Sequence, residues 1–255
     1  MRTALGVDLG ATWLRACLAE GREELWTAKI AAVGWRDLPN VLPRILRSRG
    51  LRRVGTITVG GTRLGGEKDR AALRRALAPL ARRVRVVPDF ELAHLAAFGR
   101  GPGVILVAST GSVAFARGAD GRSRRAGGLG PLLGDEGSGF WLGRQALSDP
   151  GLCGSLPSPL ALAHSADPVR STAALAPRVL RRSRRLREAA AGHLAALARR
   201  AARGLGMPKR KPLALHGSLF KNDALRASVL RRLGRGWVVV TPRLSAEKAA
   251  AGLSY

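Results

Sequence analysis

A run of glycines that ends in two adjacent carboxylates lies near the middle of the chain, at 127–139. It consists of Gly-Gly-Leu-Gly-Pro-Leu-Leu-Gly-Asp-Glu-Gly-Ser-Gly and precedes an apolar stretch that can begin a helix. Glycines let the backbone approach a ligand and adopt positive φ, and Asp135 and Glu136 offer acceptors for hydroxyls or metal-bound water near a helix N-terminus. A solvated turn before a helix over 140–147, with Asp135 as its cap, is the alternative interpretation. The run alone leaves both interpretations open.

Two further glycine-containing turns each follow an apolar run of strand length. The first, at 5–12, is Leu-Gly-Val-Asp-Leu-Gly-Ala-Thr, and the second, at 104–112, is Val-Ile-Leu-Val-Ala-Ser-Thr-Gly-Ser. Each pattern predicts a hairpin whose backbone N–H groups and hydroxyls point at the tip, where they can cradle a phosphate. Glycine-containing hairpins are also common without any ligand. Because two such turns occur about a domain apart, we interpret them as a repeated phosphate-binding feature.

The order of these motifs resembles the sugar-kinase, Hsp70 and actin superfamily of ATPases, and within it the N-acetylglucosamine kinase and BadF/BadG/BcrA/BcrD ATPase group. Residues 6–12 resemble the first phosphate motif of that superfamily, 109–112 the second, and 127–138 the family signature GGWGxxxGDEGS. The segment Pro-Asp-Phe-Glu-Leu-Ala at 88–93 is similar to the one that bears the catalytic aspartate, and Leu-His-Gly-Ser-Leu-Phe at 215–220 resembles the turn that receives adenosine. The correspondence spans nearly all 255 residues.

The sequence departs from the family pattern at several motif positions. Leu129 stands where the family usually has Trp, Ser109 where it has Gly, Pro88 where it has Asn, and Leu14 where a polar residue is frequent. None of these changes removes a carboxylate that the chemistry requires. The stretch at 151–177 carries little of the signature, so the acceptor site is the part that the resemblance defines least.

The resemblance implies an ATP-dependent kinase that phosphorylates an aminosugar such as N-acetylglucosamine or glucosamine. Phosphoryl transfer requires the γ-phosphate to be positioned, its charge to be neutralised through Mg²⁺, and the acceptor hydroxyl to lose its proton. Asp89, after a predicted strand and at a helix start, is the candidate general base, and Asp8 would hold water-coordinated Mg²⁺. The structural alternatives are an N-cap role for Asp89 and a turn role for Asp8 in which backbone N–H groups satisfy its carboxylate.

The other implied contacts divide between the two substrates. The nucleotide and its phosphates would be bound by Gly10, Thr12, Thr110, Gly111, Ser112, Gly217 and Ser218. The sugar would be bound by Gly60, Gly61, Gly128, Gly130 and Asp135, with Thr62 and Trp35 bordering its pocket. Trp35 as a core anchor and Gly217 as the glycine of a tight strand-to-helix turn are the alternatives. The four histidines have no spacing that fits a metal site or a catalytic triad, and we interpret them as structural.

Two other functional classes share this fold. One is the activator ATPase of 2-hydroxyacyl-CoA dehydratases, which needs a cysteine-ligated iron–sulfur cluster. Cys17 and Cys153 lack the spacing for such a cluster, and we interpret them as packed thiols in a reducing compartment. The other class is a non-catalytic regulator that retains the nucleotide fold, and the retained carboxylates argue against it.

Composition and charge limit the kinds of partner that we expect for this chain. A length of 255 residues with 46% hydrophobic residues suits one large or two small domains. No apolar run reaches the ~18 residues of a membrane span and a strand pattern begins at once, so we expect a cytoplasmic enzyme without a signal peptide. The net charge of +27 would attract polyanions, but aromatic residues make up 4% and the excess of arginine is typical of solvated faces. We therefore expect neither nucleic acid nor membrane as a partner, while the resemblance is consistent with a homodimer.

These residues must be positioned by alternating strands and helices. The first hundred residues predict strands over 3–7, 14–19, 25–30, 56–59 and 85–87, and helices over 38–47, 68–80 and 91–98. After a glycine-rich linker at 99–103, strands over 104–107 and 113–116 repeat the theme. Helices over 142–147, 160–164, 172–181 and 187–203 follow, then a strand over 213–215, a helix over 222–233, a strand over 237–240 and a helix over 246–253.

Three meandering strands followed by alternating helices and strands are typical of a ribonuclease-H-like lobe. We therefore predict an α/β fold of two ribonuclease-H-like, actin-like ATPase lobes with a central cleft. Residues 1–100 would form the lobe on the sugar side and 101–255 the lobe on the nucleotide side, with the last helix packing back on the first lobe.

Overall fold

The computed structural model describes residues 3–10, 12–62, 64–242 and 244–253 of the chain. It divides into two compact units, each with its own sheet and its own hydrophobic core. The first unit comprises Met1–Arg100 together with Pro242–Tyr255, and the second comprises Gly101–Thr241. The last segment of the chain therefore belongs with the first unit.

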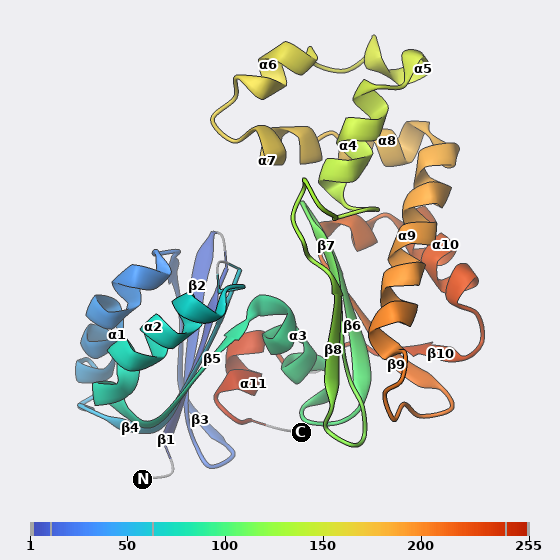
Figure 1. Ribbon diagram of the computed structural model, residues 1–255. Coiled ribbons are helices and arrows are strands. Elements are labelled where there is room, and N and C mark those ends of the chain that lie inside the picture. The colour runs from blue at the N-terminus through green and yellow to red at the C-terminus, as the bar shows by residue number, and fades with distance from the viewer. Residues whose placement is uncertain (1–2, 11, 63, 243, 254–255) are drawn as a thin grey trace. The chain divides into compact units, whose positions relative to one another are not determined.

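The first unit is built on a five-stranded mixed sheet (Figure 1). Its strands are β1 (Thr3–Leu9), β2 (Trp13–Glu20), β3 (Glu23–Ala31), β4 (Val54–Gly61) and β5 (Ala81–Pro88), in the order β3-β2-β1-β4-β5. The first three strands form an antiparallel meander, and β4 and β5 run parallel to β1. The carboxyl ends of β1, β4 and β5 therefore lie at one edge of the sheet.

Helices cover both faces of this sheet, because successive residues of a strand point to opposite faces. The buried leucines of α1 (Leu38–Arg47) and α2 (Glu67–Leu77) join Leu5, Val7 and Leu9 of β1 in one core. The intervening Gly6 faces α11 (Ala246–Ala250), and a Cβ there would lie 2.0 Å from the carbonyl oxygen of Glu247. Helix α3 (Asp89–Phe98) packs beside α11 and against β4. Glycine at position 6 thus permits the C-terminal segment to lie on β1.

The second unit repeats the same strand order. Its strands are β6 (Gly103–Ala108), β7 (Ser112–Arg117), β8 (Ser123–Gly127), β9 (Lys211–His216) and β10 (Trp237–Val239), in the order β10-β9-β6-β7-β8. Strands β6 to β8 are antiparallel, and β9 and β10 run parallel to β6. The predicted α/β class with two ribonuclease-H-like units is confirmed.

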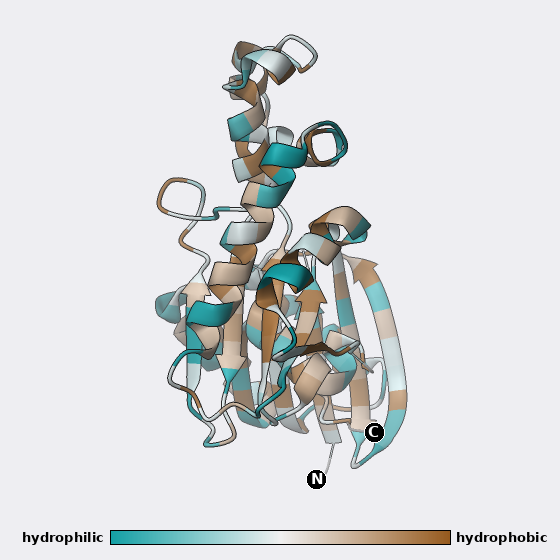
Figure 2. Cartoon of the chain, turned by 90° about the vertical axis from the view of Figure 1, so that its right-hand side faces the viewer, coloured by the Kyte–Doolittle hydropathy of each residue, from teal (hydrophilic) through white to brown (hydrophobic). Residues whose placement is uncertain are grey.

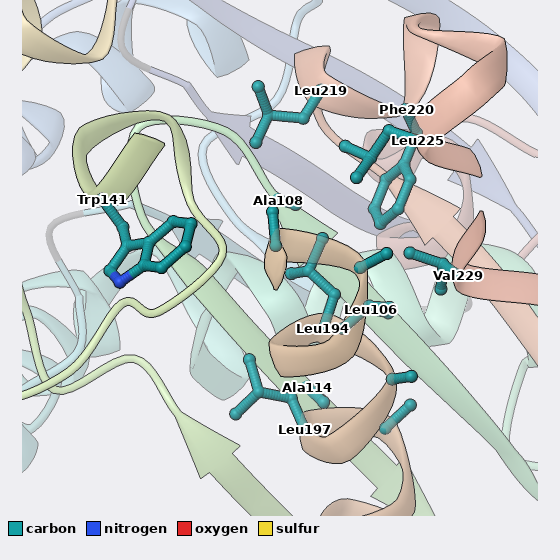
Figure 3. Packing of buried hydrophobic residues seen from close by; sticks show 14 of the residues in the cluster. Leu106, Ala108, Ala114, Trp141, Leu194, Leu197, Leu219, Phe220, Leu225 and Val229 are labelled. Atoms are coloured by element: carbon teal, nitrogen blue, oxygen red, sulfur yellow. The ribbon is translucent and has the colours of Figure 1, made fainter. Parts of the chain in front are cut away.

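The helices of the second unit form a single core with its sheet. They are α4 (Gly139–Leu147), α5 (Pro150–Cys153), α6 (Pro159–Ala163), α7 (Pro168–Ala173), α8 (Ala176–Arg182), α9 (Arg184–Ala202) and α10 (Asp223–Leu233). Hydrophilic and hydrophobic residues alternate along the helices in Figure 2, as expected when one face of a helix is buried. Leu194 and Leu197 of α9 pack over Leu106 of β6 and Ala114 of β7 (Figure 3).

Several predicted elements have different bounds. Strand β8 was not predicted, and the strand expected over 85–87 extends over Ala81–Pro88. The helix expected over 68–80 ends at Leu77, because Pro79 lies in a 3-10 turn over Ala78–Leu80. The helix expected over 172–181 is divided between α7 and α8. The glycine turn at Gly217 leads into a 3-10 helix over Ser218–Lys221, and α10 begins at Asp223 instead of 222.

Six arginines form a run at 178–187, and this run is divided between α8 and α9. Ser183 separates α8 from α9, and its hydroxyl accepts a hydrogen bond from the backbone N–H of Leu186 at 3.2 Å. Within the described residues, no helix is both long enough and apolar enough to cross a membrane.

Candidate functional site

In the first unit, the strand register brings the predicted carboxylates to the same sheet edge. Asp8 of β1 pairs with Gly60 of β4, and Gly61 pairs with Pro88 of β5, the residue that precedes Asp89. The carboxyl ends of parallel strands are where ligands bind in open α/β sheets. The structure therefore places Asp8, Gly60, Gly61 and Asp89 close to one another, as a ligand site at this edge requires.

The Asp8 carboxylate is largely removed from solvent. Its side chain is 19% exposed, and its Oδ2 lies 3.3 Å from a guanidinium nitrogen of Arg15 on β2. Burial is the main cause that raises the pKa of Asp8, and the negative charges of Glu247 and Asp89 act in the same direction. The Arg15 charge and hydrogen bond oppose this shift. A carboxylate that lies near two other acids and is stabilised by one arginine is suited to a cationic ligand.

Asp89 is the first residue of α3, and the N-cap position is occupied by Pro88. Its Oδ1 accepts a hydrogen bond from the backbone N–H of Phe90 at 2.9 Å. The interpretation of Asp89 as the N-cap is therefore wrong. Asp89 lies in the first turn of the helix, where the helix dipole favours a carboxylate. The side chain is half-buried at the same edge as Asp8.

The two glycines at the end of β4 have a packing role. A Cβ at Gly60 would lie 2.5 Å from Cδ2 of Leu92 on α3, and one at Gly61 would lie 3.1 Å from Leu9. Both glycines are buried, so they allow α3 and β1 to approach the strand. Their predicted contact with the sugar stays a prediction.

A small hollow of about 200 Å³ lies beside the first phosphate turn. Gly10, Trp35 and Thr62 are among its lining residues. Trp35 also packs against the core of this unit, so both interpretations of this residue describe part of its environment. Thr12 is exposed in the turn between β1 and β2, and its carbonyl oxygen accepts a hydrogen bond from Ala32.

In the second unit, the turn between β6 and β7 is joined to the glycine-rich run. The backbone N–H of Ser112 donates to Oδ1 of Asp135 at 3.2 Å, and the Ser112 hydroxyl donates to the carbonyl of Glu136 at 2.9 Å. Gly111 allows this approach, because a Cβ there would lie 2.7 Å from Oδ2 of Asp135. Both donors of Ser112 are engaged within the unit, whereas Thr110 is exposed at the tip of the turn.

Asp135 is a buried residue with an unusual backbone conformation. Its φ is 62°, its exposed fraction is 8%, and burial is the main cause that raises its pKa, opposed by the Ser112 hydrogen bond. The cap of α4 is Ser138, whose Oγ accepts from the N–H of Trp141 at 3.2 Å. The interpretation of Asp135 as a helix cap is therefore wrong.

The other residues of the glycine-rich run differ in their contacts and in their exposure to solvent. Gly128 donates its backbone N–H to the carbonyl of Ser112 at 2.9 Å, and Gly130 has φ of 83° with open space beside it. Leu132 and Leu133 are exposed by 92% and 78%, so the segment between the signature glycines presents apolar side chains to solvent. The predicted contacts of Asp135, Gly128 and Gly130 with the sugar stay predictions.

Gly217 follows β9 and lies directly against the end of β6. Its φ is 105°, and a Cβ there would lie 2.2 Å from the carbonyl oxygen of Ala108. This close approach brings Ser218 beside Ser109 and Thr110, and all three line one cavity of about 540 Å³. The second phosphate turn and the predicted adenosine turn are thus brought together.

The remaining wall of this cavity comes from α7, α8 and the 3-10 helix over Ser218–Lys221. It combines small and apolar side chains with three cations. The cations are Arg170, Arg181 and Lys221, and the apolar residues include Ala173, Pro177, Leu180 and Leu219. A volume of this size, an apolar wall and convergent polar groups are typical of small-molecule sites. No acidic residue lines the cavity, which favours an anionic ligand.

Sequence reasoning missed most of this wall. Arg181 lies in the arginine run that we interpreted as solvated, while Arg170 and Lys221 were not considered. The short helices that carry them have no motif, and their approach to Thr110 depends on tertiary packing. A high density of cations was the only available signal.

The cysteines and histidines provide no metal site among the described residues, since no group of three metal-ligating side chains was found there. Cys17 is buried in β2, as expected for a packed thiol. Cys153 is exposed at the end of α5, so the expectation of a packed thiol is wrong for this residue. The His193 ring lies edge-on to Trp141 with ring centroids 5.0 Å apart, consistent with a structural role.

Comparison with known proteins agrees with the geometry. No family model matches the chain. An N-acetylmuramic acid/N-acetylglucosamine kinase from Clostridium acetobutylicum is 31% identical over 101 residues, which is 39% of this chain and 33% of that kinase. The match thus spans about a third of the length of this curated relative.

Solved structures match the whole chain. A candidate N-acetylglucosamine kinase from Chromobacterium violaceum has a TM-score of 0.74 and 26% identity, with 98% of both chains covered. A second candidate N-acetylglucosamine kinase, from Porphyromonas gingivalis, has a TM-score of 0.70 and 21% identity over 98% of this chain and 97% of that one. The resemblance to proteins of the N-acetylglucosamine kinase type is confirmed.

Proposed function

We propose that this chain, whose similar proteins are sugar kinases, transfers the γ-phosphate of ATP to a hydroxyl of an aminosugar such as N-acetylglucosamine or glucosamine. The observation that carries the proposal is the cavity of the second unit, where the phosphate turn at Thr110 and the glycine turn at Ser218 share one hollow. The two turns lie about a hundred residues apart in the sequence and meet because they follow the neighbouring parallel strands β6 and β9, whose carboxyl ends are where open α/β sheets bind ligands.

The nucleotide fits this cavity by the chemistry of its lining. The apolar wall of Ala173, Pro177 and Leu180 suits the adenine ring, and Thr110, exposed at the tip of its turn, suits the phosphates. The cations Arg170, Arg181 and Lys221 add attraction for a polyphosphate. In this assignment Ser112 and Asp135 hold the turn in place by the hydrogen bonds described above.

Asp8 is the residue that we assign to Mg²⁺. Mg²⁺ is usually held by one or two carboxylates together with waters and substrate phosphates, and a partly buried carboxylate beside a single arginine fits this mode. When bound, the ion would neutralise charge on the transferred phosphoryl group. Arg15 donates a hydrogen bond to the Asp8 carboxylate, and its charge opposes the rise in the Asp8 pKa that burial causes.

Asp89 is the residue that we assign to the acceptor hydroxyl. A general base must lie within hydrogen-bond reach of the proton that it removes, and the first turn of α3 presents this carboxylate at the sheet edge. Its hydrogen bond from Phe90 fixes one oxygen of the carboxylate. That bond restrains the orientation of the carboxylate.

Measurement of ADP release with Mg-ATP tests the proposal. The acceptors would be N-acetylglucosamine, glucosamine, N-acetylmuramic acid, N-acetylmannosamine and glucose, each compared with a reaction that lacks sugar. We expect release that depends on one or more aminosugars. ADP release that is the same with and without sugar, or no release with any acceptor, would contradict the proposal.

The variant Asp89→Asn tests the assigned base. Asn retains the acceptor for the Phe90 N–H, so the fold of α3 should persist while turnover falls by about 10²–10⁴-fold. ATP affinity should not change. Asp69→Asn is the matched control, because Asp69 lies in the first turn of α2 as Asp89 lies in the first turn of α3. Full activity of Asp89→Asn would remove the assignment.

The cytoplasm as the compartment and a homodimer as the assembly belong to the same proposal. Both come from the resemblance and the composition of the chain. Light scattering of the purified protein would measure the assembly directly, and a mass of one chain, 26.9 kDa, would contradict the dimer.

A further inference from the structure

A second cavity lies in the second unit, outside the site described above. It has a volume of about 710 Å³ and forms where α9 ends and where β9 and β10 begin. Figure 1 shows this end of α9 beside β9 and β10. The candidate nucleotide cavity instead follows the carboxyl ends of β6 and β9, and the two cavities share no lining residue. The two cavities therefore lie at opposite ends of the strands of this sheet.

Four cations line this second cavity, and none of its lining residues is acidic. Arg199 donates a hydrogen bond to the carbonyl of Arg232 at the end of α10, so its guanidinium is fixed there. The other three, Arg200, Arg203 and Lys211, form no ion pair with any carboxylate that the structure describes. Asp120, which lies against Gly206 nearby, is engaged with Arg122 at 2.6 Å. The cavity therefore concentrates uncompensated positive charge.

An aromatic ring lies beside these cations. Trp237 of β10 is directly opposite Lys211 of β9 in the parallel pair, so both side chains point to the same face of the sheet. Trp237 also packs against the core, which fixes its ring, and Leu205 and Met207 add apolar surface to the cavity. Aromatic rings stack on planar bases, while arginine and lysine bind phosphates.

We propose that this cavity binds a nucleotide, with its base against Trp237 and its phosphate on Arg200, Arg203 and Lys211. The cavity volume falls within the range of small-molecule sites, and the lining supplies one ring and one cluster of cations, which matches one nucleotide. A nucleic-acid strand would need further rings along a groove, and Trp237 is the sole aromatic residue in the lining.

Titration with AMP tests the proposal, with tryptophan fluorescence as the readout. AMP carries one base and one phosphate and has no γ-phosphate to transfer. The chain has five tryptophans, and none lines the cavity that we assign to ATP, so the part of the quenching that is lost in Trp237→Phe reports the second site. We expect AMP to quench the wild-type protein and the variant Trp237→Phe to lose that quenching. Absence of quenching by AMP, or unchanged quenching in Trp237→Phe, would overturn the proposal.

Charge reversals identify the phosphate contacts. Arg200→Glu and Lys211→Glu should each weaken AMP binding about tenfold or more, because each removes a charge-assisted contact with the phosphate. Arg226→Glu is the matched control, since Arg226 is exposed on α10 and lines neither cavity. Equal affinities of the three variants would overturn the assignment. Circular dichroism establishes that each variant is folded.

Related ligands separate the contributions of base and phosphate. Adenosine and ribose 5-phosphate should each bind more weakly than AMP, since each lacks one of the two contacts. Equal binding of ribose 5-phosphate and AMP would exclude stacking on Trp237. A short oligothymidylate is tested in the same way. If it binds the wild-type protein but not Arg200→Glu, and AMP does not bind at all, the ligand of this cavity is a nucleic acid and the proposal of a nucleotide is wrong. The readout is independent of the kinase reaction, because Asp89→Asn should leave the AMP titration unchanged.

Discussion

At the scale of single residues, Asp8 is held where its charge is unfavourable. Burial raises its pKa, and Glu247 and Asp89 add negative charge in the same unit. A carboxyl that served stability alone would have a lowered pKa, as the exposed Glu67 has through its hydrogen bonds with Arg74 and Arg70. The environment of Asp8 is therefore better explained by a ligand that binds the carboxylate than by a contribution to folding.

The variant Asp8→Asn should stabilise the protein at neutral pH while it abolishes kinase turnover. A carboxyl whose folded pKa is raised binds its proton more tightly in the folded state, so its favourable contribution is present below an unfolded pKa of about 4 and declines as pH rises through the folded pKa. Thermal unfolding from acid to neutral pH measures the effect. The advantage of the variant should shrink as pH falls. A variant less stable than wild type at neutral pH would contradict this account.

The two cysteines should differ in reactivity. Burial raises the pKa of the Cys17 thiol to about 11, with the charges of Glu24 and Glu247 as further causes, whereas Cys153 is exposed. The thiolate is the reactive form, so only Cys153 should react with an aromatic disulfide reagent near neutral pH. We expect one equivalent of released chromophore from the native protein and two after unfolding. A Cys153→Ser variant that still reacts in the native state would contradict this.

At the scale of elements, Gly217 joins the two turns of the candidate nucleotide cavity. Gly217→Ala should cost about 2–5 kcal/mol, because it combines a strained positive φ with overlap of the new Cβ on Ala108. Gly121→Ala is the control, since Gly121 also has a positive φ of 78° but has nothing within 4 Å of a Cβ. Strain alone predicts about 1–2 kcal/mol there.

Denaturant unfolding of these two variants measures the difference. A Gly217→Ala variant no less stable than Gly121→Ala would show that β6 and the turn can separate at little cost. ATP affinity should also fall more in Gly217→Ala, because displacement of the turn moves Ser218 away from Thr110.

Local patterns predict those elements whose signal lies within a few residues. The apolar runs that form β1 and β6, the turns that follow them and the place of Asp8 at the end of β1 were all predicted from the sequence. Strand β8 was not, because Ser-Arg-Arg-Ala-Gly has no apolar alternation and is ordered by pairing with β7. The hydrogen bond from Ser112 to Asp135 joins residues 23 positions apart, and nothing local indicates it. Arg170 and Lys221 were missed for the same reason.

At the scale of the molecule, the two units share a strand order but differ in continuity. The second unit is formed by a single stretch, Gly101–Thr241, whereas the first requires the segment from Pro242 onward. Helix α11 of that segment packs on β1, β2 and α3, and Lys248 pairs with Glu24 at 2.7 Å. Cys17 and Ala19 of β2 form a small buried cluster with Ala251, against which Leu253 packs. The far end of the chain thus completes the unit that carries both candidate catalytic carboxylates.

Termination of the chain after Thr241 should therefore affect the first unit selectively. Loss of α11 uncovers Gly6 and Cys17, so the Cys17 thiol should become reactive in a Cys153→Ser background, where the chain that retains α11 should have no reactive thiol. Kinase turnover should fall, because Asp8 and Asp89 lie in the uncovered unit. The AMP titration of Trp237 should persist, since the second unit keeps all of its own core. A truncated chain in which Cys17 stays protected would mean that the first unit is complete without its last segment, and the continuity argument would then be wrong.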